Sequence, residues 1–169
     1  MTFKAPDSLS EQIADYLAER IIRGELAPGE RIQEQKVTLA LNVSRGSVRE
    51  ALLILERRHL VAILPRRGAH VTVLDERSVR SLCALMGEFY ILLGNAVAQK
   101  WRTDADLRPF LDIQLRLQRA HDQLDIKTFV ADSFAVMRAA YPFADNPFLQ
   151  ETVENLRPAM RRGYYLSLD

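Results

Sequence analysis

The sequence contains a single cysteine, Cys83, so an internal disulfide is excluded. Its first residues lack the basic-then-apolar pattern of a secretion leader, and no apolar run stands out as long enough to cross a bilayer. We therefore expect a cytoplasmic protein that does not associate with membranes. Because Cys83 lies within an apolar helical run, we expect a small buried side chain rather than a reactive thiol.

The sequence also lacks the motifs of common catalytic classes. It has no glycine-rich phosphate loop, no nucleophile elbow and no residues at zinc-ligand spacing. We therefore expect neither an enzyme nor a bound cofactor.

Charge is unevenly distributed along the 169 residues, although the formal net charge is only +1. Residues 36–67 carry seven basic and two acidic residues, whereas residues 75–169 carry 12 basic and 13 acidic ones. The apolar content of 48% suits globular folding as one domain or two small ones. A polyanion can thus bind near the front of the chain without attraction to the rest.

Two short helices are predicted before residue 43. Ser8 and Glu11 have the spacing of a capping box at a helix start. Apolar residues then recur every four positions, at Leu9, Ile13, Leu17 and Ile21. A turn at Pro28-Gly29 precedes a second short helix over 32–41, which Asn42 should end.

A third helix is predicted from the N-cap Ser44 to about Arg58. Its apolar stripe consists of Val48, Ala51, Leu52 and Leu55. Arg45 and Arg49 share the adjoining face, in the first turns of the helix. Because a helix start carries partial positive charge, arginines there are disfavoured unless an anion approaches them.

A basic hairpin follows the third helix. Two β-branched runs, 61–64 and 69–74, are joined by a turn at 65–68 that contains Arg66 and Arg67. Three helices followed by a hairpin give the order of a winged helix-turn-helix, in which a helix enters the major groove and the wing reaches neighbouring backbone.

The remainder has no strand signals and predicts an all-helical bundle. We expect helices at about 77–101, 104–121, 125–140 and 147–166, the last with Asn146 as cap and Pro147 as first residue. The predicted fold class is mainly α, with a winged helix-turn-helix domain over 1–74 and a helical domain over 75–169.

Residues 9–74 resemble the DNA-binding domain of GntR-family bacterial transcription regulators. The stretches that carry the resemblance are "IIRGELAPGERI", "VSRGSVREAL", "LERRHLV" and "PRRGAHV", in the family's order and spacing. The resemblance implies that Arg45 and Arg49 approach bases and phosphates, with Ser47 near the backbone. The DNA-binding residues expected from this pattern are Gln35, Ser44, Arg45, Gly46, Ser47, Arg49, Arg66, Arg67 and Gly68.

The helical remainder resembles the effector domain of the FadR-like branch, called FCD. The resemblance lies in "FVADSFAVMRAAYPFADNPFLQETVENLRPAMRR". Family members commonly bind a divalent metal through an Asp, a His four residues later and two further histidines. Asp132 aligns with that Asp, but Ala135 and Val136 stand where the His would fall, and His121 lies in another predicted helix. We therefore predict no metal site, and we interpret this domain as incomplete, since two further helices would follow in the family.

The arginines and the glycine of the third helix also have interpretations without DNA. Arg45 and Arg49 are alternatively solvated charges that pair with nearby glutamates such as Glu50 or Glu56. Glu50 is interpreted as part of the scaffold rather than as a site residue. Gly46 replaces the family's common threonine, either by drift or because backbone approaches a phosphate closely. A glycine at this position costs roughly 1 kcal/mol relative to alanine.

Similar alternatives apply outside the third helix. Gln35 stands where some relatives place a DNA-contacting arginine, and it either hydrogen-bonds DNA or is simply solvated. Arg66 and Arg67 either keep the loop soluble or contact phosphate or the minor groove. His70 either joins them or faces solvent.

The sequence therefore predicts a sequence-specific transcription regulator, by family default a repressor, that binds a palindromic operator in double-stranded DNA as a homodimer. A small-molecule effector, possibly a carboxylate, would bind the helical domain near Arg80, Asp132 and Arg138, although each is alternatively a bundle-stabilising residue. The second hypothesis is a degenerate DNA-binding or interaction protein that has lost ligand response and acts by occupancy or by pairing with relatives.

Overall fold

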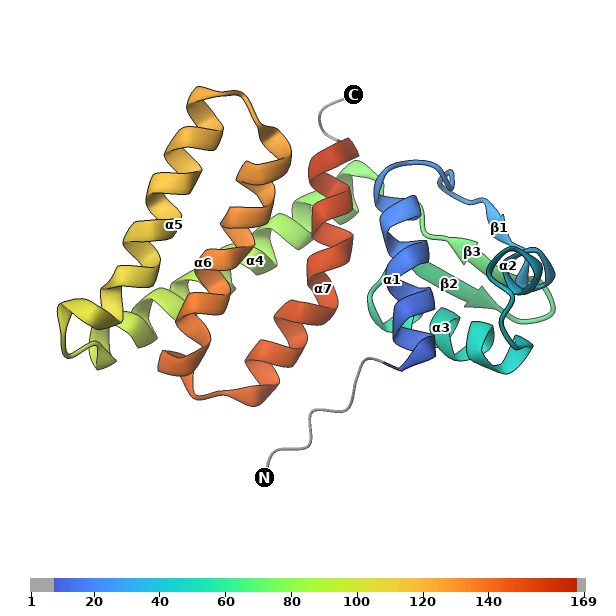
Figure 1. Cartoon of the computed structure of the whole chain (residues 1–169), viewed down its shortest axis with the longest axis horizontal. Helices are drawn as coiled ribbons and strands as arrows, with labels where there is room; N and C mark the ends of the chain where they lie inside the picture. Colours follow the sequence, from blue (N-terminus) through green and yellow to red (C-terminus); the bar gives the residue numbers. More distant parts are fainter. Residues whose placement is uncertain (1–7, 167–169) are drawn as a thin grey trace. The chain divides into compact units, whose positions relative to one another are not determined.

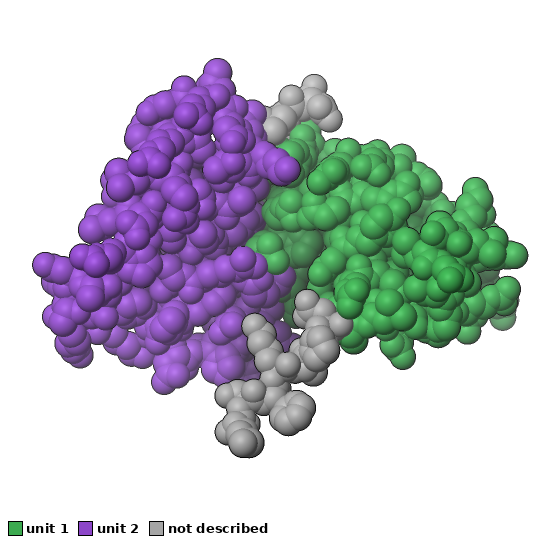
Figure 2. All heavy atoms as spheres, viewed as in Figure 1, with its two compact units in different colours: residues 1–79, 155–169 green, residues 80–154 purple. Residues whose placement is uncertain are grey.

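The structure is a computed structural model that describes residues 8–166. The chain divides into two compact units. One contains the described residues up to Val79 and those from Asn155 onward, and the other spans Arg80–Glu154 (Figure 2). The mainly α fold with an N-terminal winged helix-turn-helix is confirmed (Figure 1). The boundary expected at residue 74 stays a prediction, and the outer limits of the two expected domains, residues 1 and 169, lie outside the described part.

The first helix, α1, spans Leu9–Ile22 and begins as the capping signal predicts. Ser8 is the N-cap, and its hydroxyl oxygen accepts a hydrogen bond from the backbone N–H of Glu11 at 3.2 Å. The four-residue repeat places one apolar face of α1 in the core.

A two-residue strand, β1 (Arg31–Ile32), precedes α2 (Glu34–Leu41), so the second helix begins two residues later than predicted. Strand β1 pairs antiparallel with β3, with Arg31 opposite His70 and Ile32 opposite Ala69. A strand this short shows no alternation in sequence, and for this reason the predicted helix over 32–41 includes Ile32 of β1. Asn42 ends α2 in the left-handed conformation, as predicted.

The third helix, α3, spans Arg45–Arg57, and strands β2 (Val61–Leu64) and β3 (Gly68–Val71) form the wing. The sheet has the order β1-β3-β2 and is antiparallel throughout. The hairpin is confirmed, with its second strand ending at Val71 rather than Leu74.

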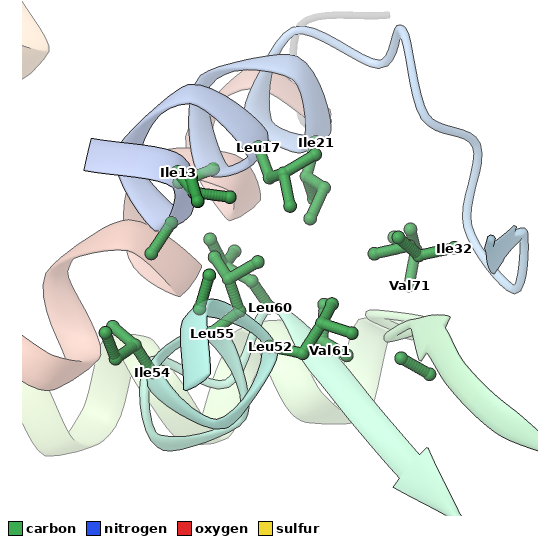
Figure 3. Packing of buried hydrophobic residues seen from close by; sticks show 14 of the residues in the cluster. Ile13, Leu17, Ile21, Ile32, Leu52, Ile54, Leu55, Leu60, Val61 and Val71 are labelled. Carbon is green, nitrogen blue, oxygen red and sulfur yellow. The ribbon is translucent and has the colours of Figure 1, made fainter. Parts of the chain in front are cut away.

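One hydrophobic cluster holds α1, α3 and the sheet together. Figure 3 shows side chains of α1, including Leu17, facing those of α3, including Leu55, with Val61 and Val71 of the wing beside them. Leu55 is fully buried and Leu17 nearly so. Burial on this scale fixes where α3 begins, and therefore fixes its first turn.

The helical remainder contains α4 (Glu76–Lys100), α5 (Asp104–Asp122), α6 (Ile126–Ala144) and α7 (Pro147–Leu166). Their bounds lie close to the predicted ones, except that α6 continues past Pro142 to Ala144. Proline favours a helix end, but here the chain leaves the helix only at Asp145, which has φ 48°. We find no strand in this part of the described chain.

Two expectations about α4 were wrong: that Cys83 is buried, and that no apolar run is long enough to cross a bilayer. Cys83 is exposed. An 18-residue window of α4 has a mean hydropathy of 1.5, so by length and composition the helix is apolar enough to cross a membrane, and only 17% of the window is buried. A single helix of this kind is weak evidence for a membrane span. The low buried fraction of this window means that many apolar side chains of α4 lie at the surface.

The last turns of α7 belong to the same unit as the winged helix. Arg161 donates to Glu19 of α1 at 2.7 Å. Arg162 is 1% exposed, and its Nη1 donates to the carbonyl and the hydroxyl of Thr72 at 2.7 and 3.0 Å. Its Nη2 has no partner in the described part of the chain, and burial lowers the pKa of the guanidinium below its ordinary value.

Candidate nucleic-acid interface

The start of α3 is held by a pair of serines. The Ser44 hydroxyl oxygen accepts a hydrogen bond from the backbone N–H of Ser47 at 3.0 Å, and the two hydroxyl oxygens lie 2.9 Å apart. The next residue, Arg45, is the first of the helix and is exposed. The cap thus places Arg45 at the positive end of α3, where an anion is favoured.

The arginines of α3 differ in their partners. Arg45 makes no ion pair with any carboxylate among residues 8–166. The Nε of Arg49 lies 3.0 Å from a carboxylate oxygen of Glu34 in α2, although the Arg49 side chain is 69% exposed. Arg58, at the end of α3, is bound by Glu11 and Asp15 of α1. Arg45 is therefore available to an external anion, Arg49 must leave Glu34 or share it, and Arg58 is structural.

The acidic residues that follow Arg49 do not pair with it. Glu50 accepts a hydrogen bond from the buried Ser10 hydroxyl at 2.6 Å. Glu56 accepts one from the backbone N–H of Ile63 at 3.0 Å. Both carboxylates tie α3 to its neighbours, so within residues 8–166 neither of them pairs with Arg45 or Arg49 as the alternative interpretation required.

The wing tip presents two arginines to solvent. Arg66 and Arg67 are exposed, and neither forms an ion pair within the described residues. The turn needs two left-handed residues, Arg66 at φ 61° and Gly68 at φ 82°. Glycine adopts that conformation readily, whereas arginine does so only with strain. His70 is half-buried, with Nδ1 3.2 Å from the carbonyl oxygen of Gly68.

An open hollow of about 530 Å³ connects α2 with the start of α3. Its lining is polar and consists of Arg31, Gln33, Glu34, Gln35 and Arg45. The structure thus brings Gln35 and Arg45 to one surface. It also places Arg31 there, which was not among the DNA-binding residues expected from sequence, although it is part of the stretch "IIRGELAPGERI".

Gly46 is not required by packing. A Cβ atom added to it would meet nothing closer than the Ser44 Oγ at 3.6 Å, an ordinary contact. Drift and close approach of the backbone to phosphate therefore both remain as interpretations, but steric exclusion within the protein does not.

Two of the expected effector residues are bound by opposite charges. Asp132 accepts two hydrogen bonds from the Nε of Arg116, at 3.0 and 3.1 Å. Arg138 makes two hydrogen bonds of 2.9 Å to Glu154, which also accepts one from the hydroxyl of Tyr141. These pairs link α5 to α6 and α6 to α7.

The remaining residues singled out in the helical part stand apart from these pairs. Arg80 is exposed on α4, and His121 is exposed near the end of α5. Over residues 8–166 no group of three or more His, Cys, Asp or Glu side chains is placed to hold a metal.

The fold and the free arginines define a winged helix-turn-helix of the nucleic-acid-binding type. Residues 9–71 match the model of the family described as "Bacterial regulatory proteins, gntR family". The resemblance to GntR regulators is thereby confirmed, whereas the FadR-like FCD branch stays a prediction.

The similarity to individual proteins extends over most of the chain. The chain is 28% identical to the HTH-type transcriptional repressor RspR of Escherichia coli K12 over 167 residues, which cover 95% of this chain and 70% of RspR. It is 26% identical to the HTH-type transcriptional regulator McbR of the same strain over 158 residues, covering 94% and 71%. The solved structure of E. coli McbR/YncC superposes with a TM-score of 0.71 at 25% identity, covering 96% and 77%. These relatives are transcription regulators and not enzymes, as expected.

Proposed function

We propose that the chain is a sequence-specific DNA-binding transcription regulator. The observation that carries this proposal is the set of arginines without carboxylate partners at the start of α3 and at the wing tip, within a gntR-family segment. Arginine binds guanine O6 and N7 or phosphate oxygens through paired N–H groups, and unpaired guanidinium groups are free to do so.

Each element contributes a different kind of contact in this proposal. Arg45 and Arg49 read base edges from α3, with Ser44, Gly46 and Ser47 against the backbone. The wing residues Arg66, Arg67 and Gly68 contact phosphates or the minor groove, and Gln35 of α2 hydrogen-bonds the duplex. Arg49 would exchange Glu34 for DNA. A salt bridge this exposed contributes little to stability, so that exchange is easy.

We further propose a cytoplasmic homodimer that binds a palindromic operator and represses transcription. Two-fold symmetry would place two α3 helices on matching half-sites. Exposed apolar side chains on α4, including Leu85, Ile91 and Leu92, support association of the helical part. Repression is supported by the relative RspR, which is described as a repressor.

Two alternatives exist for regulation: the protein responds to a small-molecule effector, possibly a carboxylate, or it has no ligand response. The ion pairs of Asp132 with Arg116 and of Arg138 with Glu154 occupy the groups expected to bind such a ligand. This favours a regulator that acts by DNA occupancy or by pairing with relatives, without ligand response. A screen of small carboxylates by melting temperature separates the two, since only a working pocket gains stability from binding.

Selection from random duplexes tests the DNA-binding proposal. Wild type should enrich a palindrome, and the Arg45→Ala, Arg49→Ala variant should lose it, with affinity for the enriched site reduced by about 1 to 3 kcal/mol per base contact. Arg23→Ala is the control, because Arg23 is also exposed but lies at the end of α1. Equal binding to all sequences, weakened by salt and unchanged in the double variant, would refute sequence-specific reading.

A further inference from the structure

Arg31 lies close both to the wing turn and to the start of α3. It belongs to the edge strand β1, where it stands opposite His70 of β3. A Cβ atom added to Gly68 would lie 3.6 Å from the Nε of Arg31 and 3.7 Å from its Nη2. The guanidinium group therefore lies directly beside the glycine of the wing turn.

The same side chain also borders the hollow at the start of α3. Arg31, Gln35 and Arg45 line that hollow together, although they come from β1, α2 and α3. Arg31 consequently connects two surfaces that would otherwise be separate, the first turn of α3 and the wing tip.

The charge of Arg31 is not neutralised by its neighbours. The adjacent Glu30 accepts a hydrogen bond from the backbone N–H of Ala27 at 2.8 Å. Glu34, on the wall of the hollow, is bound by Arg49. Within residues 8–166 no carboxylate pairs with Arg31, which is exposed. An exposed guanidinium group without a carboxylate partner among the described residues is available to an external anion.

We propose that Arg31 binds a phosphate of the DNA backbone between the segment contacted by α3 and the segment contacted by the wing. This inference rests on the proposed function and adds to it a contact from β1. A guanidinium group presents two parallel N–H donors to a phosphate, and the contact releases condensed counter-ions without reading sequence.

A purely structural role for Arg31 makes a different prediction. If the side chain only supports the wing turn through Gly68, its removal weakens DNA binding by displacing Arg66 and Arg67. That loss disappears once those two arginines are absent. A direct phosphate contact persists in their absence, so a double-mutant cycle separates the two roles.

The experiment measures affinity for the selected operator and for unrelated duplexes between 50 and 200 mM salt. Four proteins form the cycle: wild type, Arg31→Gln, the Arg66→Ala, Arg67→Ala variant and the triple variant. Arg31→Gln should weaken binding to all duplexes and should make the slope of log affinity against log salt less steep by about 1. Over this salt range the loss of affinity should then be about 4-fold smaller than in wild type. Removal of Arg31 should reduce the slope by the same amount when Arg66 and Arg67 are already replaced by alanine. Arg31→Lys should retain most of the wild-type slope, and Arg23→Gln should change neither affinity nor slope.

The outcomes distinguish this inference from the function on which it rests. If wild type binds sequence-specifically but Arg31→Gln has an unaltered salt slope, only the proposed phosphate contact is overturned. The same holds if the effect of Arg31→Gln disappears when Arg66 and Arg67 are replaced. Equal binding to all sequences, with the slope lowered by Arg31→Gln, sustains the contact and overturns sequence-specific reading. Unchanged melting temperatures are required of every variant, and Arg31→Lys provides the comparison if Arg31→Gln is unstable.

Discussion

The winged-helix segment and the helical unit differ in how far each covers its own apolar side chains. Residues 8–74 bury most of theirs in one cluster shared by α1, α3 and the sheet, and leave Leu9, Tyr16, Leu39, Leu53, Ile63 and Val73 exposed. The helical unit leaves many large ones exposed, namely Leu85, Tyr90, Ile91, Leu92, Trp101, Leu111, Leu115, Leu124, Ile126, Phe129 and Phe148. The difference teaches that the helices contain apolar surface in excess of what their own packing uses, whereas the winged-helix segment shares its core with the end of α7.

The largest expected effect is a core substitution in the winged helix. Leu55→Ala should lower the free energy of unfolding by about 3 kcal/mol, because Leu55 is fully buried and its removal leaves a cavity. Chemical unfolding followed by circular dichroism measures this loss. Leu92→Ala is the matched change in the helical unit, where the side chain is 55% exposed, and it should cost less than about 0.5 kcal/mol. Equal losses would break the comparison and show that Leu92 is covered in solution.

A smaller effect of opposite sign is expected at Arg162. Arg162→Met should raise the free energy of unfolding by about 1 kcal/mol, because it removes a buried charge that has no carboxylate partner, and an Nη2 that has no hydrogen-bond partner, among the described residues. The neighbouring Arg161→Met is the control and should lower it slightly, since it removes the ion pair with Glu19. Destabilisation by Arg162→Met in the same unfolding experiment would mean that the bonds to Thr72 outweigh the burial of charge.

The smallest expected effect is a difference in acid sensitivity. Hydrogen bonds from the Thr128 side chain and backbone lower the pKa of Asp125, the cap of α6, and backbone bonds from Arg102 and Thr103 lower that of Asp106 at the start of α5. With folded pKa values below the unfolded ones, these carboxylates stabilise the fold at neutral pH, and that contribution is lost as pH falls through the ordinary carboxyl range.

Thermal unfolding from pH 7 to pH 3 measures this dependence. The Asp106→Asn, Asp125→Asn variant should be less stable than wild type at pH 7 and should show a smaller loss on acidification. An identical pH dependence in both proteins would rule out these two caps as its source.

The same comparison explains how much could be predicted from sequence. In the winged helix, capping at Ser8 and Ser44 and apolar repeats along single faces are local signals, and they located α1 and α3 correctly. Strand β1 was missed because its two residues gain their structure from pairing with β3, which lies far along the chain. The helix bounds of the remainder were also nearly right, because caps and helical periodicity again act locally.

The candidate site, too, could be predicted from sequence only in part. Its position followed from arginines in the first turn of a helix and at a turn, which sequence displays directly. The partners did not follow, because Arg49 pairs with Glu34, fifteen residues earlier, and Arg31 meets the wing only through the sheet. The burial of Cys83 was predicted from its apolar neighbours, but composition alone does not decide which face of α4 turns inward.

The wing turn shows a conflict between stability and use. Arg66 adopts φ 61°, a conformation that costs a non-glycine residue roughly 1 kcal/mol. Glycine at this position would relax the turn and remove the charge, so selection for folding alone would discard Arg66. If Arg66 contacts DNA as proposed, the wing tip is a place where the molecule gives up stability for activity. A redesign that placed glycine there for stability would then weaken the proposed contact with DNA.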